Sequence, residues 1–171
     1  MRQLLCAAIA AWLLIPQLAK PEESERSLRL FHLHTGEHLD LVYWREKSYL
    51  PDALARLDHF LRDSITGSVH HFDPRLFDLL SDLAQVAGAP HGEIQVICGY
   101  RSSATNEYLR THTTGVAKNS LHMQGEAIDV RLPVVKLLDF RDAALGLARG
   151  GVGYYPASNF IHVDVGPFRR W

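Results

Sequence analysis

The chain has 171 residues, of which 47% are hydrophobic, enough for one domain whose core needs no obligatory cofactor or disulfide. Its 18 Lys and Arg residues nearly balance its 19 Asp and Glu residues. A protein that neutralises many phosphates needs a basic surface, and the sequence has no basic stripe, so nucleic acid is excluded as an expected partner.

The first residues have the pattern of an export signal. Arg2 precedes an apolar run over residues 4–15, which is short for a bilayer span. We expect residues 1–19 to be an export signal or, because the cleavage site is weak, an uncleaved membrane anchor. A buried N-terminal helix is the alternative. We expect residues 20–27 to be a linker between this first segment and a single domain over residues 28–171.

The domain begins with a predicted β-hairpin that turns around Gly36. Two amphipathic helices follow, the second with Asp73 as its N-cap and Pro74 at its first position. A Thr-rich loop over residues 111–119 is expected to form one wall of a cleft. In chain order, the predicted elements are strands 28–34 and 39–43, helices 51–65 and 74 to about 88, strand 94–98, helix 103–109, strand 126–132, helix 134–148 and strand 161–165.

Two of these predicted strands carry ionisable side chains on one face. In residues 126–132, Asp129 alternates with β-branched apolar residues, so it points away from them. In residues 161–165, His162 and Asp164 alternate with isoleucine and valine in the same way. Each strand therefore has an apolar face and a face with candidate ligands.

These polar faces, together with a histidine just upstream, predict a metal site. His122, His162 and the Asp129 carboxylate can bind one zinc ion and leave a position open for water, as in hydrolytic metal sites. Ligand distances of about 2.0–2.2 Å require the two strands to pair, preferably antiparallel. A helix would also bring His122 near Asp129, but Gly125 and the β-branched residues favour a turn followed by a strand. Taken singly, each histidine would be an ordinary half-buried polar residue.

Other histidines and one cysteine are weaker candidates. His32 with His34, and His70 with His71, could bind metal only weakly, because neither pair has a third ligand nearby in sequence. Cys98 ends an apolar strand, and we expect a small buried residue rather than a catalytic thiol, because no sequence neighbour would lower its pKa. If the first segment is removed, no internal disulfide can form.

Four short motifs lie in the second half of the chain. They are Gly99-Tyr100-Arg101-Ser102, Ser120-x-His122-x-x-Gly125-x-Ala127-x-Asp129, Gly151-Val152-Gly153-Tyr154-Tyr155-Pro156 and Phe160-Ile161-His162-Val163-Asp164-x-Gly166. Together they resemble the zinc D-Ala-D-Ala metallopeptidases, and within these murein endopeptidase K and its relatives, over residues 28–171. The resemblance implies a hedgehog-like α+β fold, one catalytic zinc ion per chain, and cleavage of cross-links between peptidoglycan stem peptides.

The resemblance also implies a role for each matching residue. It makes His122, Asp129 and His162 the zinc ligands. Arg101 matches the arginine that binds substrate near the scissile bond, by clamping a carboxylate or by stabilising the developing oxyanion. Ser120 matches a small hydroxyl residue that lines the substrate site.

The substrate-binding candidates also have an ordinary structural interpretation. Arg101 could be a surface arginine at a turn, and Ser120 could cap the turn that follows it. Tyr154 and Tyr155 are close enough in sequence to His162 to line the groove, although we expect these tyrosines, like Trp44 and Trp171, to serve in packing.

The sequence leaves the general base open. Many relatives carry an acidic residue three positions before the last histidine, but Asn159 is there and cannot accept a proton. Asp164 lies on the same strand face as His162, so it could either take the proton of the water or orient an imidazole. Glu126 is a further candidate, although a place beside the Gly125 turn suits an exposed charge equally well.

The expected fold is α+β, with a central mixed or antiparallel sheet and helices packed on one side. The expected reaction is metal-assisted peptide hydrolysis of peptidoglycan in the periplasm, with membrane contact only through an uncleaved N-terminal segment. One alternative is a zinc D,D-carboxypeptidase that trims terminal D-Ala. The other is a non-catalytic zinc-containing cell-wall binding domain, which the missing acid at Asn159 keeps open.

Overall fold

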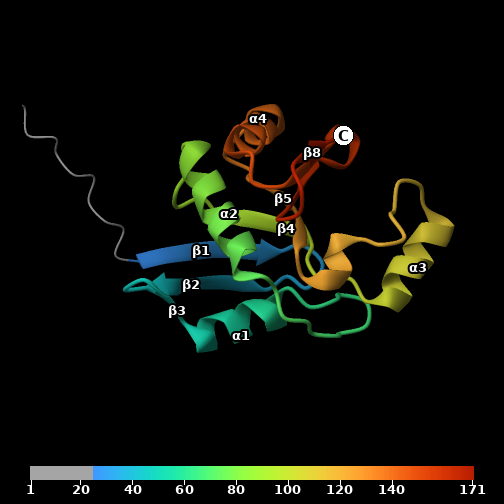
Figure 1. Cartoon of the computed structure of the whole chain (residues 1–171), viewed down its shortest axis with the longest axis horizontal. Coiled ribbons are helices and arrows are strands. Elements are labelled where there is room, and N and C mark those ends of the chain that lie inside the picture. Colours follow the sequence, from blue (N-terminus) through green and yellow to red (C-terminus); the bar gives the residue numbers. More distant parts are fainter. Residues whose placement is uncertain (1–24) are drawn as a thin grey trace, which may run out of the picture.

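The computed structural model describes residues 25–171, so the expected export segment lies outside the described residues. The described chain forms one sheet of eight strands in the order β3-β2-β1-β4-β5-β7-β6-β8 (Figure 1). Strand pairs β1/β4 and β6/β8 are parallel, and the other neighbours are antiparallel. The predicted α+β class with a mixed sheet is confirmed.

Helices and strands of the described chain are interspersed. The strands are β1 Glu25–His32, β2 His38–Arg45, β3 Ser48–Tyr49, β4 Ile94–Cys98, β5 Ala127–Arg131, β6 Gly151–Tyr155, β7 Phe160–Asp164 and β8 Arg169–Arg170. The α-helices are α1 Pro51–Phe60, α2 Pro74–Val86, α3 Ser103–His112 and α4 Leu137–Leu147. Two short 3-10 helices are η1 Leu121–Gln124 and η2 Pro156–Ser158.

One face of the sheet is apolar and carries the hydrophobic core. Alternate residues of the strands, such as Leu30, Val130 and Ile161, are fully buried on this face. Helices α1, α2 and α4 cover it by packing on β2, on β1, and on β6 and β7 respectively. Helix α3 adds no residue to the described core and projects away from the sheet (Figure 1).

Strands β5 and β7 pair antiparallel, as the metal-site prediction requires. Asp129 lies opposite His162 in the register, and Ala127 lies opposite Asp164. Because neighbouring strands are about 4.8 Å apart, this register brings the carboxylate and the imidazole on the same face within contact. The opposite face of both strands remains in the core.

Helix α1 is shorter than predicted, since it ends at Phe60 rather than near residue 65. The cause is Asp63, whose carboxylate accepts hydrogen bonds from the backbone N–H groups of Ile65 and Thr66 at 2.9 and 3.2 Å. Such a local turn satisfies backbone donors outside a helix and competes with its continuation.

Other boundaries also differ from the prediction. Helix α4 begins at Leu137 because the preceding residues turn, and it ends where Ala148 adopts a left-handed conformation with φ of 51°. Helix α3 continues to His112, three residues beyond its expected end. Strand β1 begins at Glu25, so residues 25–27, expected in a linker, are part of the sheet. Strands β3, β6 and β8 were not predicted.

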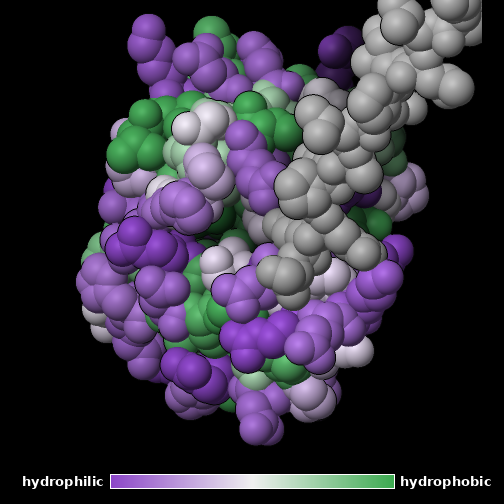
Figure 2. All heavy atoms as spheres, turned by 90° about the vertical axis from the view of Figure 1, so that its left-hand side faces the viewer, coloured by the Kyte–Doolittle hydropathy of each residue, from purple (hydrophilic) through white to green (hydrophobic). Residues whose placement is uncertain are grey.

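The face at the left-hand side of Figure 1 is mainly hydrophilic where it is visible. Figure 2 shows polar and charged residues over most of this face, with hydrophobic residues scattered between them. Among the described residues, no helix combines the length and the apolar composition needed to cross a bilayer.

Candidate metal centre and substrate cleft

Three predicted ligands meet on the face of the sheet that the core does not use. His162 Nδ1 lies 2.9 Å from Asp129 Oδ1, and His122 Nε2 lies 3.3 Å from the same oxygen. The two imidazole nitrogens are 3.1 Å apart. Atoms bound tetrahedrally to one zinc ion at about 2.1 Å would themselves be separated by roughly 3.4 Å, so the spacing suits a shared ion.

The turn at Gly125 brings His122 to this position. Gly125 has φ of 68° and ends the short helix η1, so the chain reverses directly into β5. A Cβ atom at Gly125 would collide with the backbone carbonyl of His71, and the Gly125 carbonyl accepts a hydrogen bond from Asp73 N–H. A glycine is therefore needed both for the conformation and for the close approach.

Hydrogen bonds on the far side of each imidazole leave one nitrogen free. His122 Nδ1 lies 2.8 Å from the Gly99 carbonyl oxygen, which can only accept, so this nitrogen carries the proton. His162 Nε2 lies 3.0 Å from Asp164 Oδ2 and donates to that carboxylate. In the neutral imidazoles the nitrogens that face Asp129 therefore hold lone pairs, which is the tautomer that metal ligands need.

The electrostatics of the cluster favour a bound positive charge. Burial opposes ionisation of Asp129, yet His122 and His162 hold the pKa of its carboxyl below the ordinary value. Burial likewise opposes a charged His122, but Asp129 raises the pKa of that imidazole well above its ordinary value. A cluster that would otherwise attract a proton, and whose inward atoms all carry lone pairs, fits a divalent cation.

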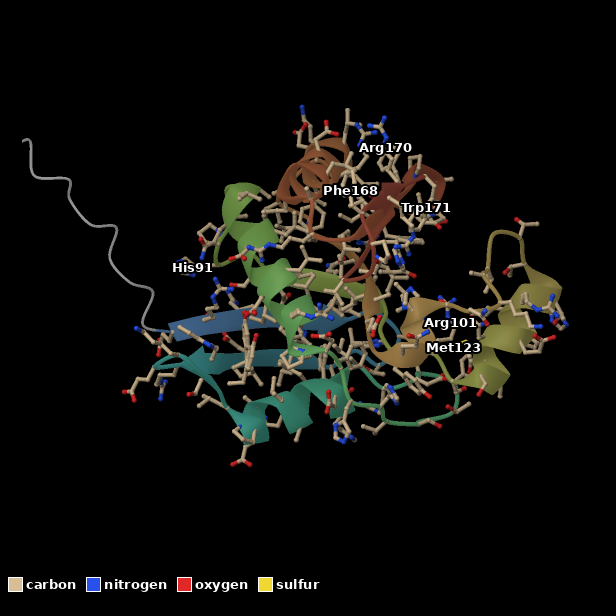
Figure 3. All side chains as sticks on the ribbon, in the orientation of Figure 1. His91, Arg101, Met123, Phe168, Arg170 and Trp171 are labelled. Atoms are coloured by element: carbon tan, nitrogen blue, oxygen red, sulfur yellow. The ribbon has the colours of Figure 1, made fainter. Side chains whose placement is uncertain are left out.

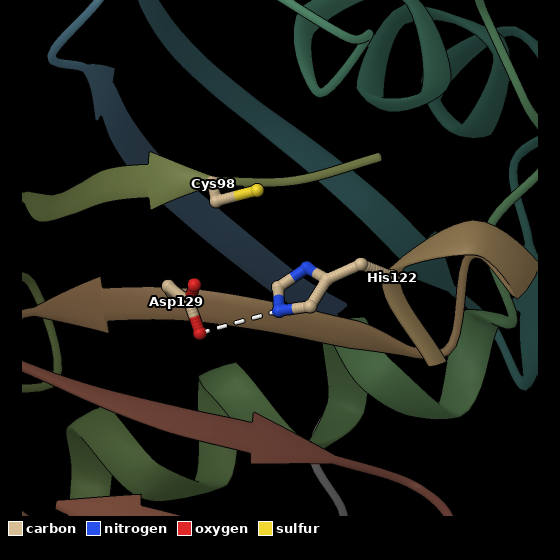
Figure 4. A group of neighbouring side chains, drawn as sticks. All are labelled: Cys98, His122 and Asp129. Carbon is tan, nitrogen blue, oxygen red and sulfur yellow. Dashed lines mark ion pairs between the residues drawn. The ribbon is translucent and has the colours of Figure 1, made fainter. Parts of the chain in front are cut away.

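Cys98 adds a thiol beside this cluster, on strand β4. Figure 4 shows Cys98, His122 and Asp129 as neighbours, and one ligand atom from each lies within 4.8 Å of the others. Cys98 is a partly buried residue, and although burial raises the pKa of its thiol, His122 and Arg101 lower that pKa below the ordinary value. The expectation that no sequence neighbour would lower this pKa is therefore wrong for Arg101, three residues further on, while the larger cause, His122, is distant in sequence.

Asp164 is enclosed behind His162. Its side chain is 0% exposed. Oδ1 accepts hydrogen bonds from the backbone N–H groups of Gly151 and Gly166, and Oδ2 accepts from His162 and from Arg169. Burial raises and these bonds lower the pKa of the carboxyl, with a net shift below the ordinary value. Of the two roles predicted for Asp164, this geometry favours orienting the imidazole.

The other candidates for a base lie away from the ligand trio. Glu126 immediately precedes β5 and is three residues from Asp129, so strand alternation places it on the opposite face. It does not line the cleft. Asn159 is exposed at the turn between β6 and β7 and lines a different, shallow cavity with Arg131.

A cleft of about 470 Å³ opens over the ligand trio. One wall is the loop from Thr114 to Leu121, which confirms the predicted role of this segment. The opposite wall contains aromatic and basic residues near the end of the chain, and Figure 3 shows Arg101 and Trp171 on two sides of the site. Those lining residues are Tyr155, Phe160, Arg169 and Trp171.

Two aromatic residues differ from what the sequence indicated. Tyr154 points away from the cleft, where the Arg141 guanidinium lies 4.8 Å from its ring, because alternation along β6 gives the cleft to Tyr155. Trp171, expected to pack, is 51% exposed, and its ring centre lies 5.2 Å from that of His162. Trp171 Nε1 donates to the Tyr155 hydroxyl at 2.7 Å, and this contact could not be found from sequence.

Arg101 borders the ligand trio as expected. Its side chain is only 11% exposed, and its nearest carboxylate oxygen, Asp129 Oδ2, lies 3.8 Å away. Ser120 is buried at the rim of the cleft, and its side chain makes no capping bond to η1. The capping alternative for Ser120 is therefore not observed.

Members of the two weaker histidine pairs are used in local structure. His32 is buried, and its Nδ1 accepts from the backbone N–H groups of His34 and Thr35. His70 stacks on Tyr100, and His71 Nδ1 lies 2.7 Å from Asp58 Oδ2. Neither pair gains the third ligand that a metal site would need in the described chain.

Comparisons with known proteins agree with this geometry. The chain matches the family described as Peptidoglycan L,D-endopeptidase MepK over residues 20–171. The protein belongs to this family. A probable peptidoglycan L,D-endopeptidase MepK of Haemophilus influenzae is 46% identical over 85% of this chain and 78% of the relative. The peptidoglycan L,D-endopeptidase MepK of Escherichia coli K12 is 44% identical over 85% of this chain and 80% of the relative.

Membership in the MepK family confirms the resemblance to the zinc D-Ala-D-Ala metallopeptidases that the motifs indicated. No solved structure matches the chain.

Proposed function

We propose that this protein is a zinc-dependent murein endopeptidase that hydrolyses peptide cross-links of peptidoglycan. The observation that carries the proposal is the convergence of one Asp129 oxygen and one nitrogen each of His122 and His162, all within 3.3 Å, beneath an open cleft. Membership in the MepK family supports peptidoglycan as the substrate, because relatives are named peptidoglycan L,D-endopeptidases.

The proposed cofactor is one zinc ion per chain, held by His122, Asp129 and His162. A zinc ion there would supply a Lewis acid that polarises the substrate carbonyl and lowers the pKa of a water to about 7. Asp164 acts as a positioning residue, since its bond to His162 Nε2 orients the imidazole with Nδ1 toward Asp129, where a zinc ion would be held. The donor set of two imidazoles and one carboxylate suits a catalytic rather than a structural zinc site.

Arg101 and Ser120 are the proposed substrate-binding groups. The guanidinium can clamp a substrate carboxylate or stabilise the oxyanion that develops on the scissile carbonyl. The Ser120 hydroxyl at the rim can bind the peptide backbone. The aromatic residues of the cleft are Tyr155, Phe160 and Trp171, in place of Tyr154.

The proton of the attacking water is proposed to leave to solvent. Within the described chain, Asp129 is the only carboxylate that lines the cleft, and Asp164 has its oxygens occupied by donors. If zinc is bound, a water with a pKa of about 7 would be half ionised at neutral pH, so the nucleophile could form without a side-chain base.

The cellular setting and the detailed fold follow from the same proposal. Peptidoglycan lies outside the cytoplasmic membrane, so we propose that the protein is exported and acts in the periplasm. The mixed sheet, with three helices on one face and the ligands on the other, suits the hedgehog/D,D-peptidase fold.

One experiment tests the function and separates it from the two alternatives. Purified protein is incubated with cross-linked muropeptides, after chelator treatment and again after zinc is returned, and the products are separated by chromatography and mass. Loss of cross-linked species only with zinc supports the endopeptidase. Release of terminal alanine alone would indicate a carboxypeptidase, and no product despite stoichiometric zinc would indicate a binding domain.

A further inference from the structure

A second cavity of about 400 Å³ adjoins the cleft and is not used by the proposed chemistry so far. This side cavity lies where the carboxyl ends of β1 and β4 meet, between α3 and the segment that follows α1. It shares two lining residues with the cleft, Arg101 and Asp129. A bound chain that extends from the cleft into the side cavity therefore passes directly over the proposed metal ligands.

Arg101 is underused as a hydrogen-bond donor at the boundary between the two cavities. Its Nε is buried and has no hydrogen-bond partner in the described chain. In the described chain its terminal nitrogens make only long contacts, to Asn106 Oδ1 and Cys98 Sγ at 3.5 Å each and to Asp129 Oδ2 at 3.8 Å. A guanidinium has five N–H donors and pairs best with a planar carboxylate at about 2.8 Å, so the observed contacts leave room for an anionic ligand.

The other charges of the side cavity are already paired. Asp129 Oδ1 lies 3.3 Å from His122 Nε2 and 2.9 Å from His162 Nδ1. Asp63 accepts backbone hydrogen bonds from Ile65, Thr66 and Ser102. Arg62 forms an ion pair with Glu37 at 2.9 Å. Arg101 is thus the charged group of this cavity whose close contacts are incomplete.

Apolar side chains form much of the rest of the cavity wall. They are Ile65, Ile97, Tyr100 and Leu109. An apolar wall with one underused guanidinium is complementary to a short aliphatic chain that carries a carboxylate.

We propose that the side cavity binds a carboxylate-bearing aliphatic segment of the substrate, on the far side of the scissile bond from the part held in the cleft. This inference rests on the proposed endopeptidase function, because an enzyme that cuts between two joined peptides must hold both. A peptide joined through a side-chain amine keeps its own terminal carboxylate, and Arg101 binds that group while the apolar wall contacts its aliphatic stem.

Filling the side cavity tests its use. Leu109→Trp places a larger side chain in the cavity. We expect KM for a cross-linked muropeptide to rise by about tenfold with kcat retained. Tyr108→Trp is the matched control, because Tyr108 is the neighbouring exposed residue on α3 and does not line the cavity. Thermal melting of both variants checks that they fold.

Charge at the cavity mouth gives an independent test with little risk to folding. Ile65 is 67% exposed, so Ile65→Glu should fold, and we expect it to raise KM about threefold relative to Ile65→Gln by repelling the carboxylate. A muropeptide with that terminal carboxylate amidated should lose the difference between the two variants.

The outcomes separate this inference from the proposed function. If wild-type protein with zinc cuts no cross-link, the function itself fails. If wild-type protein cuts the cross-link, but folded Leu109→Trp and Ile65→Glu keep the KM of their controls, the function stands and the side cavity is not a substrate site.

Discussion

The strand pairs β1/β2 and β5/β7 both alternate apolar and polar residues. The polar side chains lie on the face that the helices leave uncovered, and they are exposed in the first pair but buried in the second. On β1 and β2 this face is open to water, and Arg29 and Asp40 form an ion pair there at 3.2 Å with side chains 50% and 69% exposed. On β5 and β7 the corresponding face is buried, and His162 and Asp164 make a 3.0 Å contact with side chains 10% and 0% exposed.

The difference is caused by what covers each part of the sheet. The loop from Thr114 to Leu121 and the chain end around Arg169 and Trp171 enclose β5 and β7, whereas no described element encloses the same face of β1 and β2. An exposed ion pair is screened by water, while the polar atoms of a buried pair must all find hydrogen-bond partners. The polar side chains of β5 and β7 form a buried cluster because the face of the sheet that carries them is covered.

The largest expected effect comes from removing the carboxylate of Asp129, compared with the same change on β2. Asp129→Asn should lower kcat/KM by more than about 1,000-fold, because the lost anionic ligand weakens zinc binding directly. Asp40→Asn, the matched change on β2, should leave activity unchanged and alter the free energy of unfolding by less than about 0.5 kcal/mol. Zinc content by mass spectrometry and kinetics on muropeptides measure both; equal zinc content in the two variants would contradict the assignment.

Asp164→Asn should have an intermediate effect. The amide cannot serve as the anionic acceptor for His162 Nε2–H and leaves Arg169 without its buried partner, so we expect zinc affinity to fall by about 10- to 100-fold. The free energy of unfolding should fall by roughly 3 kcal/mol. Competition with a chromogenic chelator gives the affinity, and urea unfolding gives the stability; unchanged zinc affinity in a destabilised variant would mean that Asp164 is only structural.

A substitution at the turn before β5 should be smaller but specific. Gly125→Ala combines a left-handed backbone with a collision against the His71 carbonyl, so it should destabilise by about 2–3 kcal/mol and reduce zinc affinity. Gly115→Ala also has a positive φ but meets no atom within 4 Å, so about 1 kcal/mol is expected without loss of zinc affinity. Thermal melts and zinc titrations compare them, and identical melting temperatures would contradict the collision.

The smallest expected effect is on stability in acid. The folded-state pKa of Asp164 lies below its ordinary value, so its ionised form stabilises the fold fully above the unfolded pKa of about 3.9. That contribution is lost as pH falls through the lower folded-state pKa. After chelator treatment, the free energy of unfolding should therefore fall more between about pH 5 and pH 3 for wild type than for Asp164→Asn. Parallel pH profiles in urea unfolding would exclude this role.

Local patterns predicted most of the regular elements and the ligand trio. Alternation of apolar residues around Asp129 and His162 identified both strands, and Asp73-Pro74 identified the start of α2. Helix ends were less predictable, since the Asp63 carboxylate ends α1 through bonds to residues further along the chain. Periodicity contains no information about such a competing turn.

The sequence by itself determined which side chains could share a zinc ion, because strand alternation and the spacing around Gly125 depend on the local backbone. Only the tertiary structure decided where Asp164, Glu126, Tyr155 and Cys98 lie relative to the cleft. Their positions depend on which strand lies next to which, and on what covers each face. Neighbours that are distant in sequence set the burial and the hydrogen bonds of a carboxylate. These in turn decide whether the carboxylate orients a ligand, binds an ion or faces water.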